Sequence, residues 1–499
     1  MKPPDLPTIP EKDFETLPQW AKDYFVVLRA TCEMWKAIAL RQEAEILELK
    51  AEIKALKEEN AKLRERVAQL EAQLRQNSNN SSKPPSSDPL HLAAKRLQDK
   101  IRSGKKPGGQ PGHGKHEQKV IPTEDVRQVF PERCKDCHAP LSGNDPEPRL
   151  HQHIEIPKIH PDVTHFLLHQ LTCSGCGAVT RGHVPAGNRS SFGPRLEALV
   201  SHLTGFYRFS KRKIVGLLDE VLGIPISLGM VCKLQARTTR ALEAGMAEID
   251  GRIMNSAESK NVDETGQRVC GKLQFAWVAS SPSAVKIGIG PRSMDSFEKL
   301  VGQNQGVITS DRFPVYHHLE PERWQICWSH LTRDFQAAVE ERNETSATAN
   351  GLKQIAKRMF RSWNSVRDGT RSRMAFVQNS LGRIRSQFRK ALEQGAQFGK
   401  RKLATLSRFL LSHWTSLWRY AHVEGVEPTN NEAERQLREL VIYRKISLCI
   451  QSAIGRRFVE SIFSVIATCK LHKVKPLEYL RDCIESFRLK MPAPVMIPG

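Results

Sequence analysis

The sequence predicts a multidomain protein: an N-terminal α-helical coiled coil, a small zinc ribbon, a helical region, and a C-terminal α/β core with an all-α insertion. Three observations predict it: a seven-residue apolar repeat, two C-x-x-C pairs, and a change from helical to strand periodicity after residue 258. The expected segments are residues 1–39 (helical lead), 40–76 (coiled coil), 77–125 (linker), 126–190 (ribbon), 191–250 (helical region), 251–342 and 423–490 (two parts of the core) and 343–422 (insertion).

The chain is strongly basic. Its 76 Lys and Arg against 54 Asp and Glu leave a net charge of +22, which favours a polyanionic partner, nucleic acid ahead of an anionic membrane surface. No apolar run approaches the roughly 18 residues of a spanning helix, and the first residues lack the apolar core of a signal peptide. We therefore expect a cytoplasmic protein with no membrane partner. In that reducing compartment the 11 cysteines are metal ligands or ordinary buried residues.

The apolar repeat predicts a parallel homodimer. Leu56 and Leu63 lie at d positions on either side of Asn60, a polar a-position residue that pairs with its twin and fixes the register. The flanking g and e residues of two parallel copies are opposite in charge in four successive pairs, so self-pairing is permitted. The alternative is a single amphipathic helix that lies on the protein's own core. The repeat consists of Ile46, Leu49, Ile53, Leu56, Asn60, Leu63, Val67, Leu70 and Leu74.

The segment after the repeat is polar and rich in Pro and Gly, so we expect a disordered basic linker. Lys105 and Lys106 in "KKPGGQPGH" could follow phosphates or enter a minor groove. A solvated tether explains the composition equally well.

Two C-x-x-C pairs, Cys134/Cys137 and Cys173/Cys176, predict a structural zinc site. The 35 residues between them exceed the usual finger spacing and must form strands of their own. Four cysteine ligands would leave no open position on the metal, which argues against catalytic zinc. The alternative is four unliganded thiols.

Residues 191–250 have helical periodicity and resemble a helix-turn-helix, with Gly223 at the turn and basic residues on the outer faces. This pattern predicts a DNA-binding region. A plain helical hairpin is the alternative.

The period then becomes that of strands, and Asp263 lies on the first strand while Asp311 follows the fourth. Three strands, a helix near residues 293–301 and two further strands fit the start of a ribonuclease H-like core. In such a sheet the first and fourth strands are neighbours, so both carboxylates could enter one site that binds two divalent ions for phosphoryl transfer. The strand segments are "KNVDETGQRV", "KLQFAWVASS", "SAVKIGIG", "GVITSD" and "RWQICW".

The insertion is helical in period and unusually basic. Residues 351–402 hold fourteen Lys or Arg and two acids, Asp368 and Glu393. Solvated helices mix their charges, so a segment of one sign favours contact with a DNA backbone.

The segment "PTNNEAERQLREL" offers two candidates for a third carboxylate. Thr429 and Glu432 have the T-x-x-E spacing of a capping box, which gives Glu432 a structural role. Glu434 lies about 200° away from Glu432 on the helix and shares the apolar face, so it is the one expected near the aspartates. Basic residues of the same helix are predicted to contact DNA: Arg435, Arg438, Arg444 and Lys445.

Eight ordered motifs resemble transposases of the insertion-sequence-66 family: "NSNNSSKPPSSD", "KKPGGQPGH", the two C-x-x-C pairs, "VDET", "SDRFPVY", "CWSHLTRDF", "PTNNEAERQLR" and "ATCKLHKVKPLEYL". The resemblance implies a bacterial DDE transposase that uses Mg²⁺ or Mn²⁺, binds terminal inverted repeats, exposes 3′-hydroxyls and joins them to target DNA. Its catalytic and metal-binding residues would be Asp263, Asp311 and Glu434. It also implies accessory proteins from the same element and a place at the nucleoid.

This chain departs from the family's pattern at Arg312 and Glu439, and neither change removes a catalytic carboxylate. Cys327 and His330 form a C-x-x-H for which a structural role is favoured. Two other functions stay open: a non-catalytic dimeric zinc-containing DNA-binding regulator, and a nuclease of the same fold that cuts without joining.

Overall fold

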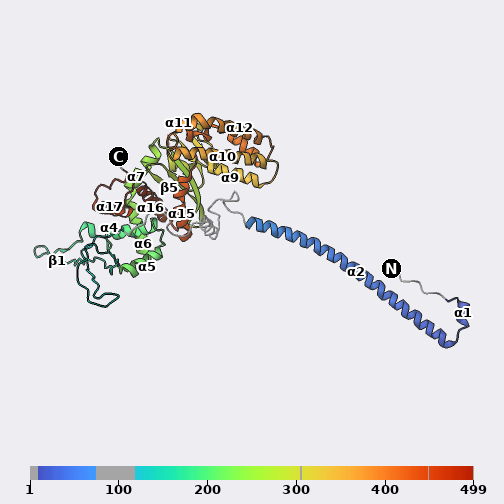
Figure 1. Cartoon of the computed structure of the whole chain (residues 1–499). Helices are drawn as coiled ribbons and strands as arrows, with labels where there is room; N and C mark the ends of the chain where they lie inside the picture. The colour runs from blue at the N-terminus through green and yellow to red at the C-terminus, as the bar shows by residue number, and fades with distance from the viewer. Residues whose placement is uncertain (1–8, 75–118, 304–305, 448, 498–499) are drawn as a thin grey trace. The chain divides into compact units, whose positions relative to one another are not determined.

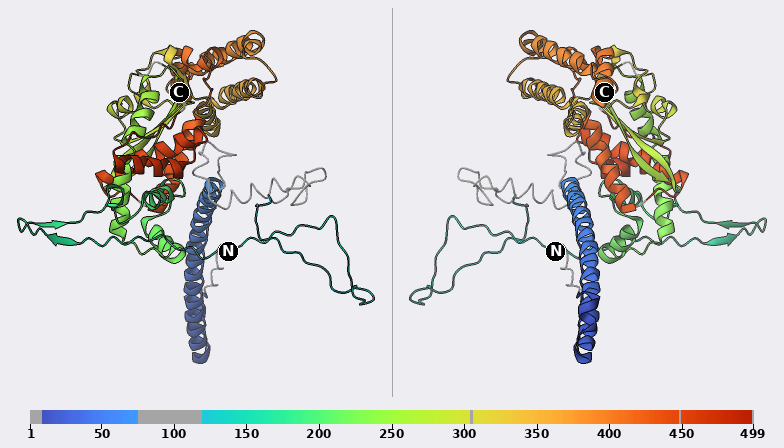
Figure 2. Two further views of the ribbon diagram at one scale, coloured as in Figure 1. Left: turned by 90° about the vertical axis from the view of Figure 1, so that its left-hand side faces the viewer. Right: turned by 90° about the vertical axis from the view of Figure 1, so that its right-hand side faces the viewer.

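The computed structural model describes residues 9–74, 119–303, 306–447 and 449–497. The chain divides into two compact units, Met1–Leu90 and His91–Gly499. The first consists of α1 (Glu11–Glu15) and the 56-residue helix α2 (Gln19–Leu74). Figure 2 shows α2 as one unbroken rod, so the helix continues across the predicted boundary at residue 40. Within the described ranges, no helix has the length and apolar character needed to cross a membrane.

Residues 119–190 form little regular structure. The strands β1 (Gln170–Thr172) and β2 (Val179–Arg181) pair as an antiparallel hairpin, seen as a thin projection in Figure 2. A short 3-10 turn, Ala186–Asn188, follows. Most described side chains of this segment are exposed, so it has no core of its own.

Four helices come next: α4 (Pro194–Gly205), α5 (Lys211–Leu222), α6 (Leu228–Ala241) and α7 (Glu243–Asn255). Gly223 ends α5 with φ of 62°, a left-handed conformation that glycine adopts at little cost. Ser227 then caps α6 by accepting a hydrogen bond from the Met230 N–H. The first three helices surround a small core of Val200, Leu203, Ile214, Leu218, Ile226, Val231 and Leu234.

A five-stranded sheet has the order β5-β4-β3-β6-β7. β3, β4 and β5 are antiparallel neighbours, whereas β3, β6 and β7 run parallel, so the predicted adjacency of the first and fourth strands is confirmed. Cys270 and Gly271 both have positive φ and close the β3–β4 hairpin. The elements are β3 (Lys260–Val269), β4 (Lys272–Ser280), β5 (Val285–Gly290), α8 (Met294–Val301), β6 (Ile308–Ser310), two 3-10 turns (Pro314–Tyr316, Pro321–Arg323) and β7 (Trp324–Ile326).

After α9 (Trp328–Glu340) the insertion folds entirely as helices, grouped as one lobe in Figure 1. Its interior is aromatic: Trp328 lies 5.1 Å from Trp418 and 4.9 Å from Phe388 between ring centroids. The tryptophans of the insertion are therefore largely core residues. Its elements are α10 (Ser346–Arg367), α11 (Arg373–Phe376), a π turn (Val377–Leu381), α12 (Gly382–Ala396), α13 (Lys402–Ser412), a 3-10 turn (Thr415–Leu417) and α14 (Arg419–His422).

The chain then returns to the sheet as α15 (Asn431–Ser447), α16 (Ala453–Leu471) and α17 (Pro476–Leu489). α15 packs on β3 and β4, and α16 runs along the edge strand β5.

Side chains of α16 satisfy the outer backbone groups of β5. The N–H groups of residues 285, 287 and 289 donate to Thr468 Oγ1 at 3.1 Å, Ser464 Oγ at 2.9 Å and Glu460 Oε1 at 2.8 Å. These acceptors recur every four residues, so one face of a helix matches alternate residues of a strand. The exposed sheet edge is thereby closed against further strand pairing.

We expect Thr468→Val to lower the free energy of unfolding by about 1–3 kcal/mol, because the Val285 N–H is left buried without an acceptor. Urea unfolding measures the change. Thr468→Ser keeps the hydroxyl and should lower the free energy of unfolding less. A valine variant as stable as the parent would contradict the role given to these α16–β5 hydrogen bonds.

Candidate active site

Asp263 and Asp311 occupy matching positions on two neighbouring parallel strands, Asp263 within β3 and Asp311 directly after β6. Asn261 of β3 pairs with Thr309 of β6. Asp263 and Asp311 each follow two residues later, and residues two apart along a strand point to the same face. The structure thus brings the predicted pair together where β6 ends.

Glu434 contributes a third carboxylate from the first turn of α15. Burial raises the pKa of Asp263 well above its usual value, and the charges of Glu264, Asp311 and Glu434 raise it further. Burial also raises the pKa of Asp311. The hydrogen bond that its carboxylate accepts from the Phe313 N–H at 2.9 Å lowers this pKa and so offsets part of the shift. These acids share one electrostatic site, in which like charges must be offset by protons or by a cation.

Glu432 lies on another part of the helix surface. Its carboxylate pairs with Arg435 and accepts a hydrogen bond from Gln436 at 2.9 Å. The predicted capping box of Thr429 with Glu432 does not form, because α15 begins one residue later than that box requires. The first helical bond instead runs from the Glu434 N–H to the Asn430 carbonyl.

Helix α9 holds the Glu434 carboxylate. Arg333 Nη2 lies 3.2 Å from Glu434 Oε1, and His330 Nε2 lies 3.8 Å from the same oxygen. Burial, with the charges of Arg333 and Arg312, lowers the pKa of His330 to about 4, so this imidazole is neutral near pH 7. Arg333 is therefore the cation that balances Glu434 in this structure.

A fourth carboxylate, Glu264, was not singled out from the sequence. Its side chain is 1% exposed, receives Arg292 Nη2 at 2.6 Å on one oxygen and the Tyr316 hydroxyl at 2.6 Å on the other. The Arg292 guanidinium also stacks 3.5 Å from the centre of the Phe313 ring. Glu264 and Tyr316 belong to "VDET" and "SDRFPVY", but no spacing rule in those motifs indicates that they bond to each other.

Cys327 ties the end of β7 to the segment before α15. Its thiol lies 2.9 Å from Ser329 Oγ and accepts the Asn430 N–H at 3.4 Å. The Trp328 N–H donates to the Pro428 carbonyl at 2.9 Å. Full burial raises the pKa of Cys327, so its contacts are those of a neutral structural thiol.

The model of the Transposase IS66 family matches residues 189–458, more than half of the chain. The chain belongs to this family. The match runs from the segment before α4 into α16 and so includes all three carboxylates. A second match, to a family of unknown function (DUF6444), covers residues 37–119.

Two uncharacterized proteins of Sinorhizobium fredii, y4qI and y4jD, are each 25% identical to this IS66-family chain over 215 and 226 residues. The matches cover 40% and 42% of this chain and 40% and 43% of those proteins. The chain thus spans about two fifths of the length of the curated relatives it matches.

The donor chemistry of the carboxylate site fits Mg²⁺ or Mn²⁺, because hard oxygen ligands suit these ions. Among the residues that the structure describes, however, no three His, Cys, Asp or Glu side chains come close enough to hold a metal ion. Glu434, the third of these carboxylates, pairs with Arg333 of α9 in this structure.

The same finding leaves the predicted zinc site unsupported. Cys134 and Cys137 lie in one turn, closed by the Cys134 N–H to the Ala139 carbonyl at 2.9 Å, and Cys173 and Cys176 lie in a second turn of the same kind. Backbone N–H groups within each turn lower the pKa of its first thiol. The segment lacks a core of its own, and among the described residues the two turns do not form a group of three or more potential ligands.

The residues predicted to bind DNA differ in how free their side chains are to do so. Arg435, Arg438 and Lys445 are exposed on α15. Arg444 instead bonds the Gly266 carbonyl and lies 3.2 Å from Thr265 Oγ1, which commits part of its guanidinium to β3. Lys105 and Lys106 lie outside the described residues.

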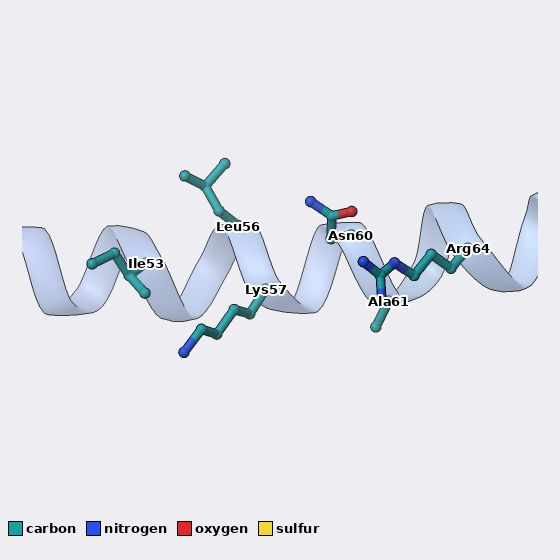
Figure 3. Close-up of a pocket in the computed structure, with 6 residues that line it drawn as sticks. All are labelled: Ile53, Leu56, Lys57, Asn60, Ala61 and Arg64. Carbon is teal, nitrogen blue, oxygen red and sulfur yellow. The ribbon is translucent and has the colours of Figure 1, made fainter.

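The residues predicted to dimerise lie on one side of α2. Leu56 is 53% exposed and Leu63 is 57% exposed, and Asn60 between them is also exposed. Figure 3 shows Leu56 and Asn60 extending from the same side of the helix.

We expect Asp263→Asn to raise the free energy of unfolding at neutral pH by about 1–3 kcal/mol in metal-free buffer. A carboxyl group whose pKa is raised on folding costs stability once the pH exceeds its usual pKa, and asparagine removes that charge. The gain should shrink as the pH falls toward the usual carboxyl value. Urea unfolding over a pH series tests this, with the exposed Glu393→Gln as control; a gain that grew in acid would contradict it.

Proposed function

We propose that this protein is a DDE transposase that binds the ends of an insertion sequence, cleaves DNA there to expose 3′-hydroxyls and joins them to target DNA. The observation that carries the proposal is the buried pair of Asp263 and Asp311, with the partly exposed Glu434 acting on Asp263 through its charge, in a chain of a transposase family. The strand order β5-β4-β3-β6-β7, with the first and fourth strands adjacent, supports a ribonuclease H-like core for this site.

The carboxylates would hold two Mg²⁺ or Mn²⁺ ions, which supply activation of the attacking oxygen and stabilisation of the leaving oxygen. Asp263 on β3 and Asp311 at the end of β6 lie on neighbouring strands, close enough for the charge of Asp311 to raise the pKa of Asp263. Glu434 can join them once its carboxylate leaves Arg333. The freed guanidinium would then remain in the site as a cation for a DNA phosphate.

Glu264 has a positioning role in this proposal. Its bonds to Arg292 and Tyr316 brace both ends of the segment that follows β6, since Arg292 stacks on Phe313. Asp311, at the start of that segment, also bonds the Phe313 N–H. These contacts would fix the Asp311 carboxylate for metal binding.

DNA recognition would involve the α5–α6 pair and α15. Arg212 and Lys213 on α5 and Lys233 on α6 are exposed, and the turn between the helices has the glycine end and serine cap of a helix-turn-helix. Arg438 and Lys445 extend this basic character on α15. Accessory proteins of the element are a further expected partner.

A non-catalytic DNA-binding regulator explains the charge of the chain but not the acidic site. Burial raises the pKa of three neighbouring acids, Asp263, Glu264 and Asp311, which is a cost that a structural protein would avoid by using neutral residues. A nuclease of the same fold would share the site. Only joining of the cut end to a second DNA distinguishes a transposase from it.

The central test compares Glu434→Gln with Glu432→Gln, two identical changes two residues apart. With element-end DNA and Mg²⁺, Glu434→Gln should lose cleavage and joining and keep DNA binding, because only Glu434 shares the site of Asp263. Glu432→Gln should remain active. Loss of activity in the Glu432 variant alone would reverse the assignment, and cleavage without joined product in the parent would favour a nuclease.

We also propose that α2 forms a parallel homodimer. Its seam residues are exposed, and the hollow in Figure 3 is lined by Ile53, Leu56 and Asn60 of the seam with Lys57, Ala61 and Arg64 beside it. Such a hollow is the kind of site that a partner's apolar side chain fills in a coiled coil.

Leu56→Lys with Leu63→Lys should abolish self-association, because both substitutions place charge in the seam. Light scattering after size-exclusion chromatography gives the mass. Ala51→Lys with Ala55→Lys adds the same charge outside the seam and outside the hollow, and should leave the dimer intact. An unchanged mass for the leucine variant would exclude this interface.

A further inference from the structure

Helices α10 and α12 carry a basic face on the insertion. Its polar residues recur at intervals of three and four along each helix, which places them on one side. On α10 they are Gln354, Lys357, Arg358 and Arg361, and on α12 they are Arg383, Ser386, Gln387 and Lys390. All are exposed except Gln387, which is partly buried. We call these eight residues the basic face.

The two halves of the basic face adjoin. Arg358 Nη2 donates to Gln387 Oε1 at 2.8 Å across the two helices. Trp363, later on α10, meets Phe376, which precedes α12, with 5.6 Å between ring centroids. The helices are therefore antiparallel, as Figure 1 also shows them side by side, and Arg361 comes next to the Arg383 end of α12.

The eight residues include no acid, and the acid next to them on α12, Glu393, pairs with Arg389 at 3.1 Å. Within the described part of the chain, the side chains of Lys357, Arg361, Arg383 and Lys390 make no ion pair or hydrogen bond with another residue. Lys357 and Arg361 are also one helical turn apart, where like charges destabilise a helix.

Some other exposed cations of the insertion are balanced by acids. Arg401 pairs with Glu344 at 2.8 Å, and Lys402 pairs with Glu341 at 3.0 Å. The cations of the basic face, in contrast, lack such acid partners, so they are free to pair with an external anion.

We propose that the basic face binds the phosphate backbone of duplex DNA, an assignment that rests on the proposed function. Arg383 and Lys390 are two turns apart, about 10 Å along the helix, over which a duplex presents about six phosphates. The face bears cations and neutral amide or hydroxyl groups, which suit phosphate oxygens.

An apolar protein partner fits this surface poorly. Met374, on α11, is the exposed large apolar residue among the described residues of the insertion helices, and it lies outside the basic face. The absence of exposed aromatic side chains from the face also favours backbone contact over stacking on bases.

The face is coupled in structure to the candidate active site. α10 packs against α9, and Lys353 of α10 bonds Gln336 of α9. α9 in turn carries Arg333, the partner of Glu434. DNA bound on the basic face would therefore be held by the same helical layer that lines the carboxylates.

The test measures binding of the full chain to a duplex of unrelated sequence, without divalent metal, over a series of salt concentrations. The triple variant Arg361→Gln, Arg383→Gln and Lys390→Gln should bind at least about tenfold more weakly and lower the slope of log affinity against log salt by about 2–3, near 0.9 per lost phosphate contact.

A matched control removes three exposed cations that are already paired with acids: Lys299→Gln, Arg401→Gln and Lys402→Gln. It changes the net charge equally and should keep the parental slope. Equal losses in both triple variants would reduce the effect to net charge and overturn the proposal, as would an unchanged slope in the first variant.

Asp263→Asn separates this inference from the proposed function. It should bind the duplex as the parent does and cut nothing. If Asp263→Asn cleaves element ends, the active-site assignment fails while the salt slopes still decide the basic face.

Discussion

The mutual repulsion of buried carboxylates is the constraint on which the candidate active site and the elements around it depend. Asp263, Glu264 and Asp311 each have a pKa raised by burial, and Glu434 adds its charge to the first of them. A protein can maintain such a cluster only if neighbouring groups offset each charge. The offsets come from separate elements: Arg292 between β5 and α8, Tyr316 after β6, and Arg333 on α9.

Contacts elsewhere in the fold hold these balancing side chains in place relative to the carboxylates. α16 fixes the sheet from its edge through three side chains spaced by four residues, so β5 and its neighbours have a defined position. Cys327 and Asn430 join the end of β7 to the start of α15, which sets where Glu434 stands relative to the strands. The aromatic core of the insertion then packs behind α9. The carboxylates are therefore positioned by contacts between segments more than a hundred residues apart in sequence.

Much of this could be predicted from the sequence because periodicity is local. The alternation of β3 and β4 and the position of Asp311 after a short apolar run indicated the strands and their order. The helical period of α15 separated Glu434 from Glu432, although the capping box was wrong because the start of α15 depends on contacts made by Asn430 with Cys327. Glu264 and Tyr316 could not be paired in advance, since their bond forms only when the loop after β6 folds back on β3.

Arg333 links the carboxylates to the insertion. In this structure Glu434 is neutralised by this side chain of α9, the helix against which the insertion packs. A divalent ion and a DNA phosphate would each compete for one member of this pair: the metal for the carboxylate and the phosphate for the guanidinium. Binding of either ligand would then weaken the ion pair that opposes the other, so metal and DNA should bind more tightly together than separately. The coupling needs no large rearrangement, only the exchange of one salt bridge for two ligand contacts.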